Sequence, residues 1–176
     1  MNTYDFGDGN GPVAAHKHSN GGGWVADSAT VADSAYVGPD AMVFGEAKVS
    51  GYAWAYGNAK VYGKAWVSDN AKVYGKAKVF GKAWVFGYAE VYGDAEVFGY
   101  AWVFGYAEVF GDAWVFGDAE VFGDAEVSGY AKVFGYARVC DNAMVCGNAE
   151  VSDSAKVYGD AVVSGNAVVY EGEITK

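Results

Sequence analysis

The sequence is poor in the residues on which catalytic, metal-binding and disulfide-bonded sites depend. Its 176 residues include only two cysteines, two histidines and two prolines. Two cysteines are too few for a disulfide framework and lack the spacing of a zinc site. No apolar run is long enough for a signal-peptide core or a membrane span. We therefore expect a cytoplasmic product by default, with an extracellular or virion fibre as the alternative.

Basic residues are also scarce. Lys and Arg number 12 against 22 Asp and Glu, which gives a formal net charge of −10. A protein that grips phosphates needs a surplus of Lys and Arg, so this balance argues against nucleic acid as a partner, and we expect no membrane partner either. An acidic surface mainly favours solubility.

What the chain has instead is a strict repeat. Alanine recurs at every sixth position from Ala29 to Ala167, 24 times in all, and two residues after each alanine stands valine, with Ala55 the one exception. The unit is Ala-x-Val-x-Gly-x. Alternation with a period of two is typical of a β-strand, and the glycine supplies a turn after each strand.

The cost of burial decides which face points inward. If the x positions were inside, charged side chains such as Lys60, Lys72 and Glu90 would be buried without partners, at several kcal/mol each. Burying one valine stabilises the fold by roughly 1.5–3 kcal/mol. Alanine and valine therefore line the core, and the x residues face solvent.

Two of the units, VYGKAW (residues 61–66) and VFGDAE (residues 121–126), resemble the hexapeptide repeat of left-handed parallel β-helix proteins. The resemblance implies a triangular prism with three units in each coil and a left-handed winding. Twenty-four units at three per coil then predict an all-β fold, a single-stranded left-handed parallel β-helix of about eight coils of 18 residues. We assign residues 23–170 to this β-solenoid.

Residues 18 apart stack in such a fold, so the outward positions form ladders. One face is predicted to carry Trp66, Trp84 and Trp102 with Phe86, Phe104 and Phe122 beside them, and a second face Phe80, Phe98 and Phe116. Stacked aromatics stabilise one another, and enough exposed aromatic area also marks an interaction site. These nine residues are the candidate assembly or ligand-binding face.

Charge is sorted along the chain as well. Residues 47–86 hold seven lysines and one acid, whereas residues 87–126 hold nine acids and neither Lys nor Arg. Two interpretations are open: drift among solvated positions, or two rods that pack with a basic segment against an acidic one.

The ends lie outside the repeat. Residues 1–22 are rich in Gly and Asn and fit neither a coil nor a helix, which leaves a disordered tail, a cap or an arm that docks on a neighbour. Residues 171–176 form a short tail with no strong cap. An uncapped solenoid end is a template for further strand pairing.

No residues form a convincing catalytic or metal site. Related acyltransferases use a histidine base and loops that interrupt the coils, but here the two histidines, His16 and His18, lie outside an unbroken repeat. A carbonic-anhydrase type of zinc site needs three histidines, and the chain has only two. We expect no catalytic residue, no cofactor and no metal.

The leading functional hypothesis is a non-enzymatic structural protein, a rigid rod that self-assembles into a filament or oligomer through its open ends and aromatic ladders. The alternative is a binding module of a fibre or appendage whose aromatic face contacts carbohydrate. A third, weaker hypothesis is a relative of the hexapeptide acyltransferases.

Overall fold

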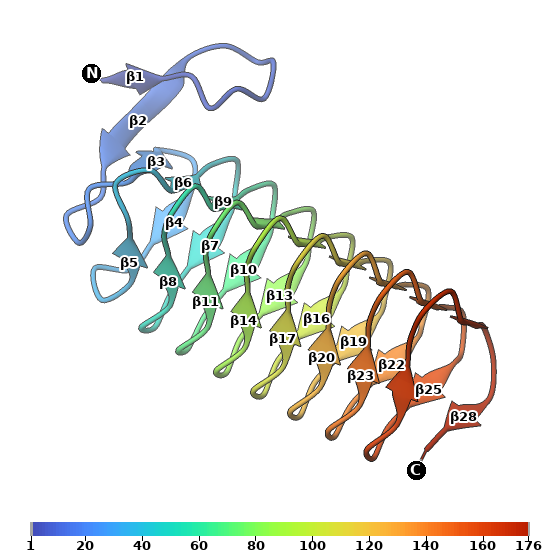
Figure 1. The fold of residues 1–176 in the computed structure, drawn as a ribbon. Coiled ribbons are helices and arrows are strands. Elements are labelled where there is room, and N and C mark those ends of the chain that lie inside the picture. The colour runs from blue at the N-terminus through green and yellow to red at the C-terminus, as the bar shows by residue number, and fades with distance from the viewer. Residues whose placement is uncertain (1, 176) are drawn as a thin grey trace.

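The repeat folds as its alternation predicts. In the computed structural model, which describes residues 2–175, each repeat contributes one two-residue strand, from β4 (Thr30–Val31) to β27 (Val168–Val169). Successive strands belong to three different sheets, which form the three sides of a rod (Figure 1). The described residues contain strands and turns but no helix. The predicted all-β parallel solenoid of about eight coils is confirmed.

Face 1 is an eleven-stranded sheet. In spatial order its strands are β1 (Thr3–Tyr4), β2 (Val13–Lys17), β3 (Trp24–Ala26), β6 (Met42–Val43), β9 (Lys60–Val61), β12 (Lys78–Val79), β15 (Glu96–Val97), β18 (Trp114–Val115), β21 (Lys132–Val133), β24 (Glu150–Val151) and β27.

Faces 2 and 3 have nine and eight strands. Face 2 contains β4, β7 (Lys48–Val49), β10 (Trp66–Val67), β13 (Trp84–Val85), β16 (Trp102–Val103), β19 (Glu120–Val121), β22 (Arg138–Val139), β25 (Lys156–Val157) and β28 (Glu173–Ile174). Face 3 contains β5 (Tyr36–Val37), β8 (Trp54–Ala55), β11 (Lys72–Val73), β14 (Glu90–Val91), β17 (Glu108–Val109), β20 (Glu126–Val127), β23 (Met144–Val145) and β26 (Val162–Val163).

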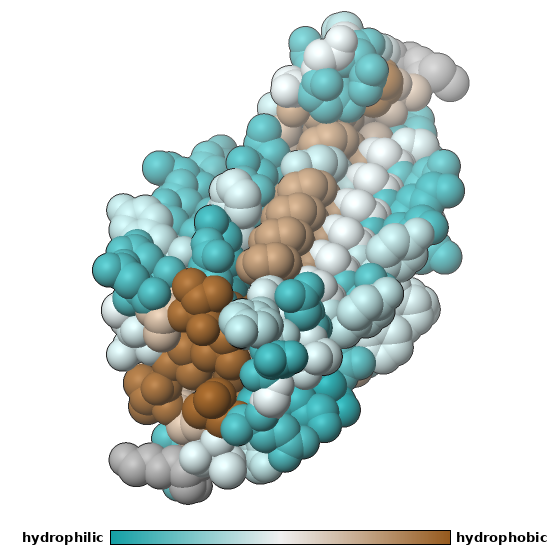
Figure 2. Space-filling model, turned by 90° about the vertical axis from the view of Figure 1, so that its right-hand side faces the viewer, coloured by the Kyte–Doolittle hydropathy of each residue, from teal (hydrophilic) through white to brown (hydrophobic). Residues whose placement is uncertain are grey.

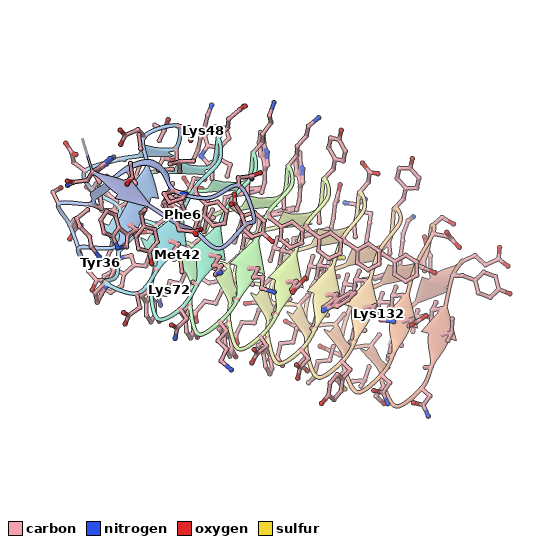
Figure 3. The ribbon with its side chains drawn as sticks, turned by 90° about the horizontal axis from the view of Figure 1, so that it is seen from above. Phe6, Tyr36, Met42, Lys48, Lys72 and Lys132 are labelled. Atoms are coloured by element: carbon pink, nitrogen blue, oxygen red, sulfur yellow. The ribbon has the colours of Figure 1, made fainter. Side chains whose placement is uncertain are left out.

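The register of the sheets is 18 residues throughout the repeat. Trp66 lies opposite Trp84 and Lys78 opposite Glu96, for example, with the strands parallel. The inward residues of the interior coils, alanine and valine, are 0% exposed. Each coil therefore repeats the same small aliphatic cross-section, and the outward side chains run in rows along the rod (Figure 3).

The turns repeat as closely as the strands. Most turns hold a glycine with a positive φ, such as Gly99 at +74°, and Asp69, Asp141 and Asp153 adopt the same conformation at φ 52–60°. Except in the last coil, the residue after the turn glycine donates a backbone hydrogen bond to the carbonyl one coil on, as Tyr88 does to Gly105 at 2.8 Å. Hydrogen bonding therefore continues around the corners of the rod, which keeps the coils in register.

The amino-terminal segment, residues 2–22, packs against the first coil. Strands β1 and β2 form an antiparallel hairpin, and β2 pairs antiparallel with β3, with His16 opposite Val25. Phe6 is 2% exposed and stacks on Phe44 with ring centroids 4.9 Å apart. Figure 3 shows Phe6 at the beginning of the row of stacked rings.

The carboxyl-terminal segment is drawn into the last coil. Strand β28 pairs with β25, with Ile174 opposite Val157. The sheet of face 2 thus continues beyond residue 170, where the sequence suggested that a tail begins, because residues 173–174 pair with β25 despite the break in the six-residue spacing. Residue 176 lies outside the described residues.

Candidate interaction surfaces

The predicted tryptophan ladder lies on face 2. Trp84 and Trp102 stack with centroids 5.2 Å apart and planes 3° from parallel. Trp66 meets Trp84 edge-on at 65°, with its indole Nε1 donating a hydrogen bond to Ser50 Oγ at 3.0 Å. Trp84 and Trp102 remain 38% and 41% exposed and form the accessible part of the ladder.

The predicted phenylalanine residues form two separate rows. Phe86, Phe104 and Phe122 border face 2, with successive centroids 4.9 Å apart. Phe80, Phe98 and Phe116 border face 1, stacked at 4.8–4.9 Å. All six are half-buried, because each ring covers the next. Stacking thus accounts for much of their apolar area, and the nine predicted residues do not form one continuous surface.

A more exposed set of aromatic residues lies at the turns, and the sequence analysis missed it. These tyrosines are 54–72% exposed: Tyr52, Tyr88, Tyr100, Tyr106, Tyr130 and Tyr136. The available signal was their position directly after the turn glycine, where a side chain is carried on the outside of a corner.

The basic and acidic segments are joined by ion pairs within the chain. Lys72 Nζ lies 2.8 Å from Glu90 Oε1, Lys78 Nζ 2.8 Å from Glu96 Oε1, and Lys76 Nζ 3.7 Å from Asp94 Oδ1. Each lysine stands one coil before its acid. Charges at the boundary are therefore partly neutralised internally, which weakens the case for pairing between rods.

Glu90 is the most connected of these acids. It accepts hydrogen bonds from Lys72 Nζ and from Tyr74 Oη, both at 2.8 Å. Burial opposes ionisation of this carboxyl, but the two hydrogen bonds outweigh burial and lower the pKa of Glu90. Burial, together with the bond to Glu90, raises the pKa of Tyr74. This cluster stabilises the middle of face 3.

The amino-terminal end of the rod is covered on two of its three faces. On face 1 the hairpin pairs with β3. On face 3 the chain before β3 pairs with β5: Gly23 N donates to Val37 O at 2.9 Å, and Val37 N donates to Asn20 O at 3.0 Å. Strand β4 on face 2 is the edge that stays uncovered within the described chain.

The glycines of this segment have a packing role. Gly21 has φ +112°, and a Cβ built on it would lie 2.3 Å from the carbonyl oxygen of Val37. The glycine at position 21 is therefore required because its backbone lies close to that of Val37, and the glycine-rich composition of residues 1–22 does not by itself indicate a disordered tail.

The carboxyl-terminal end is apolar and open. Strands β26, β27 and β28 are the last strands of their sheets. In this coil the outward position of the repeat is valine, and Val162 and Val168 are 56% and 61% exposed, with Tyr170 at 57% and Ile174 at 37%. Figure 2, which views the side on which the rod ends, shows a brown patch there. An open strand edge thus coincides with exposed apolar side chains.

The histidines serve the amino-terminal cap. His16 Nδ1 lies 2.8 Å from Asp27 Oδ1, and His18, 6% exposed, has Nε2 3.0 Å from the carbonyl oxygen of Ala35. Since that oxygen only accepts, His18 Nε2 carries the proton. Cys140 and Cys146 are free, as expected for residues on different faces. Residues 2–175 contain no group of three His, Cys, Asp or Glu side chains that could hold a metal ion.

Comparison with known protein families finds a β-solenoid repeat in the last third of the chain. A family model described as the YdcK beta solenoid repeat matches residues 137–153 and 155–171. No curated protein and no solved structure matches the chain. The matched repeat and the fold together define a β-solenoid repeat protein, and the specific resemblance to the hexapeptide-repeat family stays a prediction. Within the described residues, no helix is long and apolar enough to cross a bilayer.

Proposed function

We propose that this chain is a non-enzymatic structural protein, a rigid rod that self-associates through its carboxyl-terminal coil. The observation that carries the proposal is the difference between the two ends. One end is paired with a hairpin and a backbone segment, whereas the other exposes edge strands and apolar side chains. Open edges of this kind recruit further strands.

The difference favours a closed dimer over a filament. Head-to-tail growth requires an open coil edge at both ends of every copy, but at the amino terminus the coil edge of face 1 is covered by the hairpin and that of face 3 by the backbone of residues 20–23. Two carboxyl-terminal ends offer identical open edges to each other. A twofold axis across the rod makes the meeting strands antiparallel, and such an isologous contact closes after two copies.

The apolar contribution is modest. Covering the exposed part of Val162 and Val168 contributes about 1 kcal/mol per side chain, hence about 4 kcal/mol for two copies. Association costs at least that much in lost freedom of motion. Hydrogen bonds between the edge strands must supply the remainder, so we expect a dimer that dissociates on dilution.

Sedimentation velocity over a dilution series tests this proposal. We expect a monomer–dimer equilibrium for the natural chain and a monomer for the double variant Val162→Lys with Val168→Lys. Met144→Lys is the control, because Met144 is 37% exposed on the same face as Val162, one coil further from the end. A natural chain that stays monomeric at every concentration, or dimers that persist in the double variant, would contradict the proposal.

Carbohydrate binding on face 2 is the second candidate function. Trp84 and Trp102 offer two stacked, nearly parallel rings with centroids 5.2 Å apart and about two fifths of each residue exposed. Exposed tryptophan side chains supply the apolar contact area that the apolar faces of sugar rings can cover. Retention on a polysaccharide affinity gel that is lost with Trp84→Ala, while the dimer is unchanged, would favour this function.

A further inference from the structure

A slot between two tyrosine side chains lies at the corner between faces 1 and 2. Turn residues 18 apart stack there, so Tyr100, Asp118 and Tyr136 occupy successive coils. The aspartate is shorter than the rings on either side and leaves an opening between them. Trp102 and Glu120 complete the lining of a cavity of about 370 Å³.

The width of the slot follows from the coil spacing. Aromatic rings one coil apart have centroids 4.8–5.2 Å apart along this rod, as in Tyr88 and Tyr106 at 5.0 Å. Tyr100 and Tyr136 are two coils apart, so their rings are separated by roughly 10 Å. A cation midway would lie roughly 5 Å from each ring, inside the ~6 Å range of cation–π attraction.

The charge of the slot also favours a cation. Glu120 Oε2 pairs with Arg138 Nε at 3.0 Å, whereas Asp118 has no ion-pair partner among residues 2–175. One carboxylate charge is thus uncompensated at the base of the slot. On the opposite side of Tyr100, Lys82 Nζ donates a hydrogen bond to the Tyr100 hydroxyl at 2.9 Å and lies 4.7 Å from the ring centroid, so the slot-facing side of this ring is not occupied by that lysine.

The gap selects a particular kind of cation. A methyl carbon in contact with a ring lies about 3.5–4.0 Å from it, so a gap of roughly 10 Å leaves about 2–3 Å between the two contacting carbons. This is the spacing of two methyl groups on one nitrogen. We propose that the slot of Tyr100, Trp102, Asp118, Glu120 and Tyr136 binds a quaternary ammonium group of the trimethylammonium type.

The chain contains a matched frame without the acids. The sequences Tyr52-Ala-Trp54, Asn70-Ala-Lys72 and Tyr88-Ala-Glu90 repeat the arrangement one coil at a time, but an amide and an amine replace the two carboxylates, and Glu90 stands where the slot has Arg138. Lys72 there is paired with Glu90 at 2.8 Å. The middle coil of the second frame thus carries no carboxylate and places a lysine ammonium where the slot has Glu120, so we expect no cation binding at the second frame.

Titration with choline chloride, followed by calorimetry and by the choline methyl proton resonance, tests the proposal. We expect one site in the millimolar range, with the methyl resonance shifted upfield by the tyrosine rings. Asp118→Asn with Glu120→Lys gives the middle coil of the slot the Asn and Lys of the second frame and should weaken binding at least about tenfold, with an unchanged circular dichroism spectrum. Ethanolamine, whose primary ammonium is smaller and more strongly hydrated, should bind at least about tenfold more weakly than choline.

The reciprocal variant guards against a loss caused by local misfolding. Asn70→Asp with Lys72→Glu builds the acidic base into the second frame and should raise the stoichiometry from one to two. The proposal is overturned if choline shows no methyl shift, if the Asp118 and Glu120 variant binds choline as the natural chain does, or if ethanolamine binds equally well. These readouts concern a surface in the middle of the rod and do not depend on the dimer.

Discussion

Replacing a single turn glycine tests how tightly successive coils are stacked. Gly99 has φ +74°, and a Cβ added to it would lie 2.9 Å from the backbone nitrogen of Gly117 in the next coil. A left-handed conformation costs an ordinary residue roughly 1–2 kcal/mol. The crowding costs about 1 kcal/mol more, and the stiffer unfolded chain returns about 0.4–1 kcal/mol. We expect Gly99→Ala to lower the free energy of unfolding by about 2 kcal/mol.

Aspartate should be tolerated better than alanine at the same position, although it is larger. Asp69 and Asp141 adopt the glycine conformation and accept a hydrogen bond from the backbone N–H of the turn glycine one coil on, each at 3.1 Å. Gly117 offers the same N–H to an aspartate at position 99. That bond offsets about 1 kcal/mol, so Gly99→Asp should lower the free energy of unfolding by only about 1 kcal/mol.

Urea unfolding followed by circular dichroism distinguishes these outcomes. With a slope of about 2 kcal/mol per molar, the midpoint should fall by about 1 M for Gly99→Ala and by about half as much for Gly99→Asp. Asp69→Ala, which keeps the backbone strain and loses the bond, should be less stable than Asp69→Gly. An alanine variant at least as stable as the aspartate variant would refute the argument and indicate that the coils move apart easily.

Three further changes have predictable effects. Val97→Ala, in the fully buried core, should lower the free energy of unfolding by about 2 kcal/mol in urea titrations, whereas a change under half of that would indicate that neighbouring coils close the cavity. Phe6→Ala removes the ring that stacks on Phe44 and should loosen the hairpin, so that rods with two open ends form longer chains in negative-stain micrographs; discrete dimers only would argue against a capping role. Because the folded-state pKa of Glu90 lies below the unfolded value of about 4.3, its ionised form stabilises the fold above that pH, and the contribution is lost as the pH falls through the folded-state pKa. The melting temperature of Glu90→Gln should therefore lie below that of the natural chain at pH 7 and approach it near pH 3, and a constant difference across this range would contradict the assignment.

The sequence predicts the interior of the rod because one spacing governs it. Trp84 and Trp102, or Lys78 and Glu96, are 18 residues apart and meet for that reason alone. Left-handedness, in contrast, was expected from the family resemblance, since a six-residue period fits either hand.

The ends could not be predicted in the same way. Phe6 stacks on Phe44 and Tyr4 on Trp24, at separations that are not multiples of 18. Phe6 packs in one cluster with Ala26 and Phe44. Ala26 precedes Phe44 by 18 residues, so a small side chain occupies the position one coil before Phe44. Such contacts depend on the shape of the exposed coil rather than on periodicity.

The ammonium slot was missed for a different reason. Tyr100 and Tyr136 are 36 residues apart, whereas residues that stack directly on each other are 18 apart, so the two tyrosines are not neighbours in a row. The slot exists because the short side chain of Asp118 lies between the two rings and interrupts the row of aromatic residues.

Because successive coils have the same cross-section, the length of the rod is a whole number of coil spacings. Adding or removing 18 residues in its interior would change the length by one step of roughly 4.8 Å and leave both ends facing as before. Adding six residues would instead move each row of face 1 onto face 2 in the coils that follow the insertion. Each aromatic row would then be broken at that point, and the hairpin would be turned by a third of a revolution relative to the last coil. The rows of side chains along the rod are thus preserved only if its length changes by whole coils. The distance between the hairpin and the open end is therefore set in discrete steps.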